Sequence, residues 1–234
     1  MSQYRQSPFA NLTPVVKNLL IINIIFFIAT YILQNQFDMV RWLSVFYFDS
    51  PFFRPWQVVS YMFMHASIEH IFFNMFALFM FGPILEYSLG SKRFFNLYFI
   101  CGIGAIALQW VVQAIEIHQL IGSFVVHKDT TASPEVITKI GDIYDSPILG
   151  ASGAIFGVLV AFATLYPNME MLIFFIPIPV KAKYVISVYI IYEIYSSIRQ
   201  TSGDNVAHLA HIGGAIFGFA LIKIWGTKRK DTFY

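Results

Sequence analysis

Charge is what this sequence has least of. Only 12% of its 234 residues are Asp, Glu, Lys or Arg, whereas a soluble domain carries about 25%. The net charge of +2 and the lack of a long basic run exclude a surface that tracks a nucleic-acid backbone. The single cysteine, Cys101, excludes an internal disulfide, and its apolar surroundings indicate a packing residue.

Apolar residues, by contrast, make up 57% of the chain. A membrane-spanning helix needs roughly 20 mostly apolar residues, and six stretches are interpreted as spans, the fifth being short and interrupted by Glu193. They are Val15–Leu33, Ala66–Leu85, Phe94–Ile117, Ile148–Tyr166, Tyr184–Ile198 and Val206–Trp225. No small-x-small cleavage pattern follows the first span, so we expect it to stay as an anchor. The predicted fold is an all-α polytopic membrane protein, a six-helix bundle forming one domain over residues 1–234.

Lysine and arginine predict the orientation, because cytoplasmic segments carry an excess of them. With the N-terminus in the cytoplasm, ten of these residues lie on the cytoplasmic side and five on the other. Residues 1–14 and 226–234 are therefore predicted to be a cytoplasmic N-terminal segment and a cytoplasmic tail.

The segments between the spans differ in character. Residues 34–57 are rich in aromatic side chains, which favour the headgroup boundary. We expect them to lie in the outer interface, although an ordinary aromatic belt explains part of the pattern equally well. Residues 118–147 are interpreted as a long, polar extracytoplasmic loop whose histidines lack partners at metal-ligand spacing. Met171–Val180 is too short to span and is interpreted as interfacial or as an irregular lead into the fifth span.

Polar side chains inside membrane spans are costly and mark candidate functional sites. They occur near the starts of the second, fourth and sixth spans, which all begin on the non-cytoplasmic side. The residues are His65, Glu69, His70, Asn74, Ser152, His208 and His211.

Four of these residues are predicted to share one layer toward the outer leaflet. Ser152 is four residues, and His211 five, beyond the expected start of its span, which puts both roughly 6–8 Å deep. His70 lies at a similar level, and Asn74 is one turn deeper on the same face. GxxxG patterns at 153–157 and 214–218 let helices approach closely. If those two faces meet, Ser152 and His211 come within reach of each other.

This arrangement permits nucleophilic acyl transfer. A serine hydroxyl becomes a good nucleophile when an adjacent histidine takes its proton. The oxyanion that forms needs hydrogen-bond donors, and the amides of Gly150, Ala151 and Ser152 at a helix N-terminus offer them. His70 and Asn74 could add side-chain donors. No aspartate is placed to orient His211, so a Ser-His dyad is predicted. Taken singly, each residue favours packing or a simple interhelical hydrogen bond, whereas their conjunction favours a site.

Three motifs carry this conjunction: H-x3-N at His70–Asn74, G-x-S-G at Gly150–Gly153 and A-H-x2-G-x3-G at Ala210–Gly218. An E-x3-G at Glu86–Gly90, followed by SKRFF, accompanies them. With these motifs the chain resembles the rhomboid family of intramembrane serine proteases over nearly its whole length.

The resemblance implies a six-helix core with Ser152 as nucleophile and His211 as general base. It implies an oxyanion site made of His70, Asn74 and the Ser152 amide. It also implies a loop before the second helix in the outer leaflet and a fifth helix that acts as a lateral gate. The implied substrates are single-pass membrane proteins cut near a helix end, and no cofactor or metal is implied.

The chain departs from the family pattern at a few positions. Trp56 is followed by Gln57, where many bacterial relatives have arginine, and residues 118–147 form a longer segment than usual. Glu69 occupies an often apolar position and could pair with His65. His208, three residues before His211, is expected to be a supporting or alternative base.

Three function classes are weighed. The leading hypothesis is an intramembrane serine endopeptidase in a bacterial inner membrane. An inactive relative that escorts membrane proteins would usually have lost the serine or the histidine, and both are present. A transporter is disfavoured, because the sequence shows no inverted pair of broken helices and its polar residues cluster in one leaflet. The sequence does not indicate the substrate or the oligomeric state.

Overall fold

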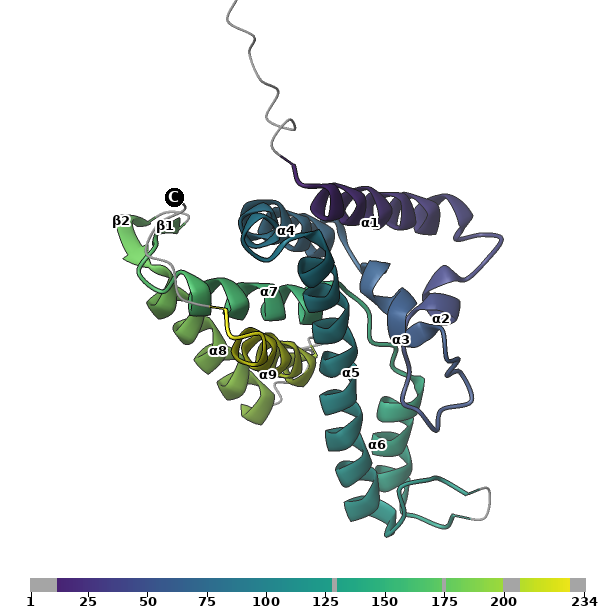
Figure 1. Ribbon diagram of the computed structural model, residues 1–234. Helices are drawn as coiled ribbons and strands as arrows, with labels where there is room; N and C mark the ends of the chain where they lie inside the picture. The colour runs from purple at the N-terminus through teal and green to yellow at the C-terminus, as the bar shows by residue number, and fades with distance from the viewer. Residues whose placement is uncertain (1–11, 128–129, 174–175, 200–206, 228–234) are drawn as a thin grey trace, which may run out of the picture.

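The computed structural model describes residues 12–127, 130–173, 176–199 and 207–227, and most of them are helical (Figure 1). The elements in chain order are α1 (Pro14–Leu33), α2 (Met39–Leu43), α3 (Gln57–Ser60), the 3₁₀ turn η2 (Tyr61–Phe63), α4 (Ile68–Leu89), α5 (Ser91–Ile121), α6 (Pro134–Asp145), α7 (Ser152–Leu165), β1 (Glu170–Ile173), β2 (Ile176–Lys181), α8 (Ala182–Arg199) and α9 (His208–Ile224).

Each predicted span has a helix as its counterpart. Among the described residues, α1, α4 and α5 are long and apolar enough to cross a bilayer. α7 and α9 are apolar but shorter, with 14 and 17 residues. α8 has 18 residues and includes Lys183, Glu193 and Arg199. The chain is thus a predominantly α-helical, polytopic membrane protein, and the count of six crossings stays a prediction.

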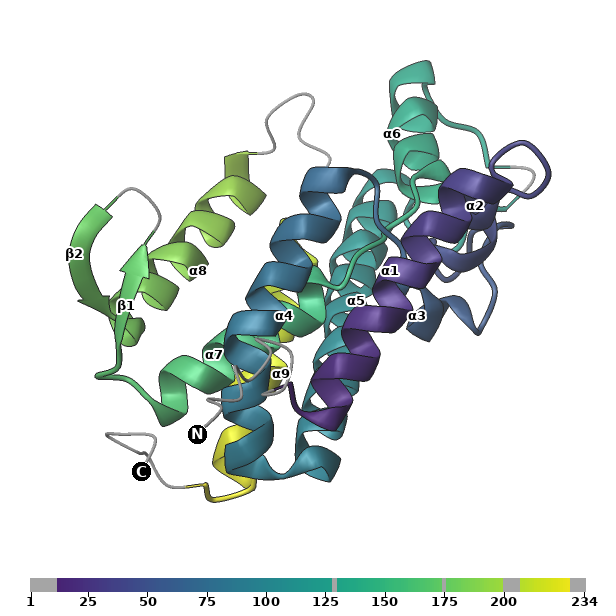
Figure 2. The ribbon, with the colours of Figure 1, turned by 90° about the horizontal axis from the view of Figure 1, so that it is seen from above.

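Helix α7 lies inside the bundle and packs against α4, α5, α8 and α9 (Figures 1 and 2). Its small residues allow this. A Cβ atom added at Gly214 of α9 would lie 1.8 Å from the carbonyl oxygen of Gly153, and one at Gly218 would lie 2.4 Å from that of Gly157. Since no side chain fits at those distances, the two GxxxG faces meet backbone to backbone, as predicted.

The segment 118–147 is not the simple loop that the sequence predicts. α5 continues to Ile121, and α6 lies beside the C-terminal end of α5 (Figure 1). Ser133 caps α6 by accepting from the Val136 amide, and proline fills the first helical position. Tyr144 of α6 is buried and donates its hydroxyl proton to Asp49. Burial, reinforced by that carboxylate, raises the pKa of Tyr144 above its ordinary value.

Met171–Val180 belongs to an antiparallel hairpin, so the interpretation as an irregular lead is wrong, whereas an interfacial position stays a prediction. β1 and β2 pair with Glu170 opposite Lys181 and Met171 opposite Val180. Both strands of a two-stranded ribbon are edges. Prolines that donate no hydrogen bond are tolerated on an edge.

A buried polar side chain, Gln57, holds part of residues 34–57 together. Gln57 is fully buried, and its amide group donates to the carbonyls of Arg41 and Phe52 at 3.2 and 3.1 Å. Its side-chain oxygen accepts from the Arg54 amide at 3.0 Å. This amide fixes the connection between α2 and α3. The position of the segment in the membrane interface stays a prediction.

Candidate active site

The segment directly before Ser152 is extended and leads into the bundle. Ile148 forms a two-hydrogen-bond bridge with Val45 at 2.8 and 2.9 Å. The Gly150 amide donates to the carbonyl of Tyr61 at 3.0 Å, and Gly150 has a φ of +131°, which strongly favours glycine. Helix α7 therefore begins at Ser152, later than the predicted start at Ile148. The pairing of Ile148 and the backbone of Gly150 prevent an earlier start.

Three helices place their first turns around this point. His70 is the third residue of α4, Ser152 the first of α7 and His211 the fourth of α9. Ser67 caps α4 by accepting from the His70 amide at 3.2 Å. The helices begin later than the sequence predicts, yet the polar residues still gather in their first turns.

Ser152 and His211 contact each other directly. Ser152 Oγ lies 2.7 Å from His211 Nε2. His211 is 8% exposed, and its ring stacks on Phe156 with ring centroids 4.4 Å apart and an interplanar angle of 9°. The stacking fixes the plane of the imidazole, and the hydrogen bond fixes which nitrogen faces the serine.

The second nitrogen of His211 has a carboxylate partner, a glutamate, where the sequence shows no aspartate placed to orient this ring and predicts a dyad. Glu193 of α8 lies with Oε2 2.9 Å from His211 Nδ1 and 2.6 Å from His208 Nδ1. Glu193 is 2% exposed. None of the sequence motifs includes Glu193. In the sequence this residue is interpreted only as an interruption of the fifth span. The cost of a charge inside a membrane span is the signal that could have identified it.

His208 forms a hydrogen bond with the same carboxylate. Its Nδ1 is the atom that bonds to Glu193, while Ser152 bonds to His211. The structure therefore favours a supporting role for His208, through Glu193, over the alternative-base role.

His70 lies across Gly150 from the serine. A Cβ atom built on Gly150 would lie 2.8 Å from His70 Nε2 and 3.5 Å from Ser152 Oγ. The missing side chain thus leaves open the space between these two groups. His70 Nδ1 accepts a long hydrogen bond, 3.4 Å, from the Ala66 amide. In a neutral ring the proton is then on Nε2, which faces this space as a donor.

Other predicted donors differ in outcome. Asn74 is 7% exposed, and its Nδ2 has no acceptor among the described residues. The Gly150 amide already donates to Tyr61 and is not a free donor, which corrects the prediction for that residue. Ala151 precedes α7, and the Ser152 amide begins it. The first amides of a helix lack intrahelical acceptors, so the Ser152 amide remains available.

The predicted pair between Glu69 and His65 is wrong. Glu69 is exposed, and neither ring nitrogen of His65 bonds to it. The His65 ring instead packs edge-on against His70, with centroids 5.0 Å apart. His65 therefore supports the position of the His70 ring.

The cluster of Glu193, His208 and His211 has the donor set of a metal site. One ligand atom of each lies within 4.8 Å of the others. Donors around a tetrahedral Zn²⁺, bound at about 2.0–2.1 Å, stand about 3.3 Å apart. The two contacts to the carboxylate oxygen are 2.6 and 2.9 Å. These distances fit direct hydrogen bonds, with the carboxylate as acceptor of both.

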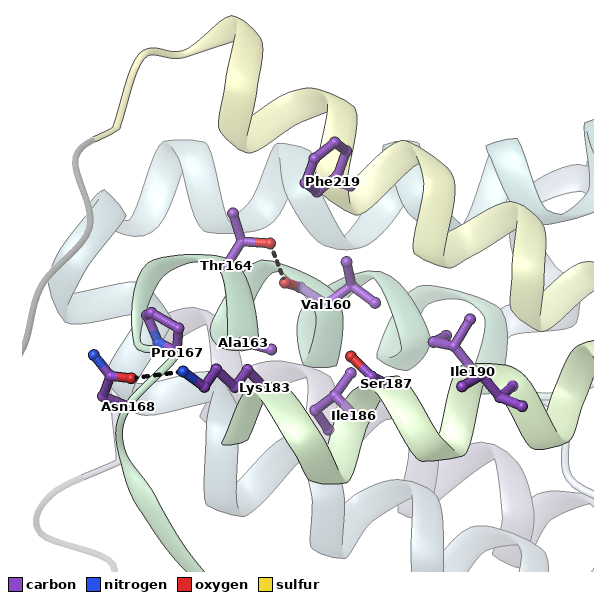
Figure 3. Close-up of a pocket in the computed structure, with 11 residues that line it drawn as sticks. Val160, Ala163, Thr164, Pro167, Asn168, Lys183, Ile186, Ser187, Ile190 and Phe219 are labelled. Atoms are coloured by element: carbon purple, nitrogen blue, oxygen red, sulfur yellow. Dashed lines mark hydrogen bonds between the residues drawn. The ribbon is translucent and has the colours of Figure 1, made fainter. Parts of the chain in front are cut away.

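A cavity of about 590 Å³ lies between α7, α8 and α9 (Figure 3). Its lining includes Val160, Thr164, Lys183, Ser187 and Phe219. Lys183 donates to the side-chain oxygen of Asn168 at its rim, at 3.2 Å. None of Ser152, Glu193 and His211 lines it, so it is separate from the serine site.

The chain is similar to a domain family and to several known proteins. The model of the family described as the Rhomboid domain matches residues 53–228. "Rhomboid protease AarA" of Providencia stuartii is 32% identical over 72% of this chain and 55% of its own length. "Rhomboid protein 1, mitochondrial" of Saccharomyces cerevisiae is 29% identical over 74% of this chain and 44% of its own length. "RHOMBOID-like protein 12, mitochondrial" of Arabidopsis thaliana is 27% identical over 94% of this chain and 60% of its own length.

The chain thus spans about half the length of these curated relatives. The family match covers most of the chain and includes Ser152, Glu193 and His211 as well as His70 and Asn74. One of these relatives is itself named a rhomboid protease. This chain belongs to the rhomboid family.

Proposed function

We propose that this chain is an intramembrane serine endopeptidase in which Ser152 is the nucleophile and His211 the general base. The observation that carries the proposal is the 2.7 Å hydrogen bond between Ser152 Oγ and His211 Nε2. It joins residues from two helices, 59 positions apart in the sequence, at a partly buried site.

The chemistry follows from this contact. Ser152 Oγ attacks the carbonyl carbon of the scissile peptide bond while its proton passes to His211 Nε2. The imidazolium then protonates the departing amine, which leaves an acyl-enzyme. A water molecule, deprotonated by the same histidine, hydrolyses it and regenerates Ser152.

The oxyanion of each tetrahedral intermediate needs donors held in place beforehand. His70 Nε2 borders the open space over Gly150, and Asn74 is a buried donor without an acceptor among the described residues. The Ser152 amide adds a third donor at the N-terminus of α7, where the helix dipole favours negative charge. Leaving a buried donor unpaired costs free energy, and an oxyanion would satisfy it.

The substrates we propose are single-pass transmembrane proteins, cut within or near the outer leaflet. The apolar exterior of the bundle supports this class, since α1 and α8 expose large apolar side chains, among them Ile32 and Ile198. The relatives include bacterial, mitochondrial and chloroplastic proteins. The bacterial inner membrane, with both termini in the cytoplasm, stays a prediction.

Labelling with a fluorophosphonate probe tests the proposal. The detergent-solubilised wild type should acquire a covalent adduct, because the probe reacts with activated serines. Ser152→Ala removes the nucleophile and His211→Ala the base, so each should reduce labelling to background. Circular dichroism and size-exclusion chromatography check that both variants remain folded.

Labelling that survives in folded Ser152→Ala would contradict the proposal. A folded wild type that resists labelling in both detergent and liposomes would favour an escort that binds membrane proteins without cutting them.

A further inference from the structure

The contact between Glu193 and His211 gives the histidine a carboxylate partner, which a Ser-His dyad does not require. A buried carboxylate is expensive unless hydrogen bonds compensate it. Glu193 receives two such bonds on one oxygen, from His208 Nδ1 at 2.6 Å and from His211 Nδ1 at 2.9 Å. Its place inside the bundle therefore depends on these two histidines.

The contact fixes the tautomer of His211. An ionised carboxylate oxygen accepts hydrogen bonds, so Nδ1 of His211 must carry a proton. In a neutral ring Nε2 is then unprotonated, and its lone pair points at the Ser152 hydroxyl 2.7 Å away. This is the form that a general base requires. With the proton on Nε2, the ring could not accept the serine proton.

The carboxylate also stabilises the charge that forms in the reaction. When the proton of Ser152 Oγ moves to Nε2, His211 becomes an imidazolium whose Nδ1–H points at Glu193. The proton on Nδ1 stays there throughout, and the carboxylate remains ionised. The second bond, from His208, holds the carboxylate in this orientation and supplies a polar partner.

The resulting chain of contacts runs across three helices. Glu193 comes from α8, both histidines from α9 and the serine from α7. α8 lies at the edge of the bundle (Figure 1), where Val188 and Ile191 are 66% and 65% exposed. Glu193 is, in contrast, among its few buried residues. The hydrogen bonds of Glu193 thus connect this edge helix to the base.

We propose that Glu193 is a positioning residue that sets the tautomer of His211 and stabilises its protonated form, so that the site works as a Ser-His-Glu triad. This inference rests on the proposed protease function. A purely structural alternative is that Glu193 only fastens α8 to α9. The two roles differ in what they do to the rate of serine modification in a folded protein.

The test compares the kinetics of fluorophosphonate labelling in the wild type and Glu193→Gln. Glutamine keeps the shape and can still bond one histidine, but it lacks the charge. The limiting rate constant at saturating probe should fall at least about tenfold, and a loss of the corresponding acid in a soluble triad costs about 10⁴-fold. The probe concentration that gives half this rate should not change, because Glu193 does not contact the probe. The pH profile of labelling should change shape.

Two variants serve as controls. Glu135→Gln makes the same substitution on the exposed surface of α6, where the carboxylate forms an ion pair with Lys139 at 3.1 Å, and should label like the wild type. Glu193→Asp retains the charge on a shorter stem and should label faster than Glu193→Gln. Thermal unfolding of all variants shows whether α8 remains docked.

Long-range ¹⁵N–¹H correlation spectra of the wild type, with His211→Ala to assign the signals, add a measurement that needs no Glu193 variant. The inference predicts that His211 carries its proton on Nδ1. A proton on Nε2, or equal limiting rates for the wild type and folded Glu193→Gln, would overturn it. Labelling that does not depend on Ser152 would instead overturn the protease function, and the inference with it.

Discussion

The proposed mechanism requires the protons of two histidines on opposite nitrogens. His211 presents an acceptor to Ser152, because its Nδ1 bonds to Glu193. His70 presents a donor on the other side of Gly150, because its Nδ1 accepts from the Ala66 amide. In the proposed mechanism the same type of side chain is thus a base in one position and an oxyanion donor in the other, and local hydrogen bonds make the difference.

Asn74→Ala tests the oxyanion donors at the level of one side chain. Removal of one such donor costs about 10²–10³-fold in the chemical rate, so the limiting rate of labelling should fall by about that factor. Global stability should change little, because the Nδ2 group has no acceptor among the described residues. Labelling quenched at successive times measures the rate, and thermal unfolding measures the stability.

Asn23→Ala is the matched control for Asn74→Ala. Asn23 is a fully buried asparagine of α1 whose Nδ2 donates to the Leu19 carbonyl at 2.7 Å. Its loss should lower the unfolding temperature and leave the labelling rate of the folded fraction unchanged. The reverse pattern in the two variants would remove Asn74 from the oxyanion site.

Site residues can be predicted from the sequence where they belong to a motif with a defined spacing. Ser152 and His211 can be found because they occur beside GxxxG patterns that bring their helices together. Glu193 cannot be found in this way, because its meaning depends on how α8 rotates against α9. The Gly150 amide is likewise assigned wrongly, since its partner, Tyr61, is a tertiary contact 89 residues away in the chain.

At the level of elements, the contact between α7 and α9 sets the geometry of the site. The carbonyl oxygen of Gly153 would lie 1.8 Å from a side chain at Gly214. Backbone atoms of two packed helices cannot yield as a flexible side chain can. The distance between Ser152 and His211 therefore depends on the absence of a single methyl group one turn away.

Gly214→Ala should consequently weaken the fold and the site together. Overpacking in a dense core costs about 1–3 kcal/mol, and this contact belongs at the upper end of that range. We expect a lower unfolding temperature and loss of labelling. Titration with a denaturing detergent, followed by circular dichroism, measures the stability.

Gly141→Ala is the corresponding control in α6. A Cβ atom there meets nothing closer than an oxygen of Asp145 at 3.9 Å. Alanine favours a helix over glycine by about 0.5–1 kcal/mol, so stability should hold or rise slightly. Equal effects of the two substitutions would contradict the role of close helix contact.

Elements outside the spans are predicted less well. α6 lies in a polar stretch, and its burial depends on Tyr47 and Ile117, which lie far away in the sequence. The hairpin of β1 and β2 forms despite prolines that argue against a strand in the middle of a sheet. In both cases tertiary contacts decide the local structure, whereas apolar length alone decides the main spans.

For the whole molecule, the amino-acid composition already predicts that the protein lies in a membrane. Few charges and long apolar runs indicate a membrane protein, and the exposed faces of the helices remain apolar in the fold. The buried Glu193–His208–His211 group is an exception inside this apolar body. Such a group is costly in a membrane and is consistent with a reaction carried out there.

The most direct measurement is cleavage in a bilayer. The protein is reconstituted in liposomes with a panel of single-pass transmembrane proteins, and products are identified by mass spectrometry. The account predicts that the wild type cuts at least one of them within or near its span. Folded Ser152→Ala should produce none of these fragments. Fragments that appear equally with Ser152→Ala would contradict the account.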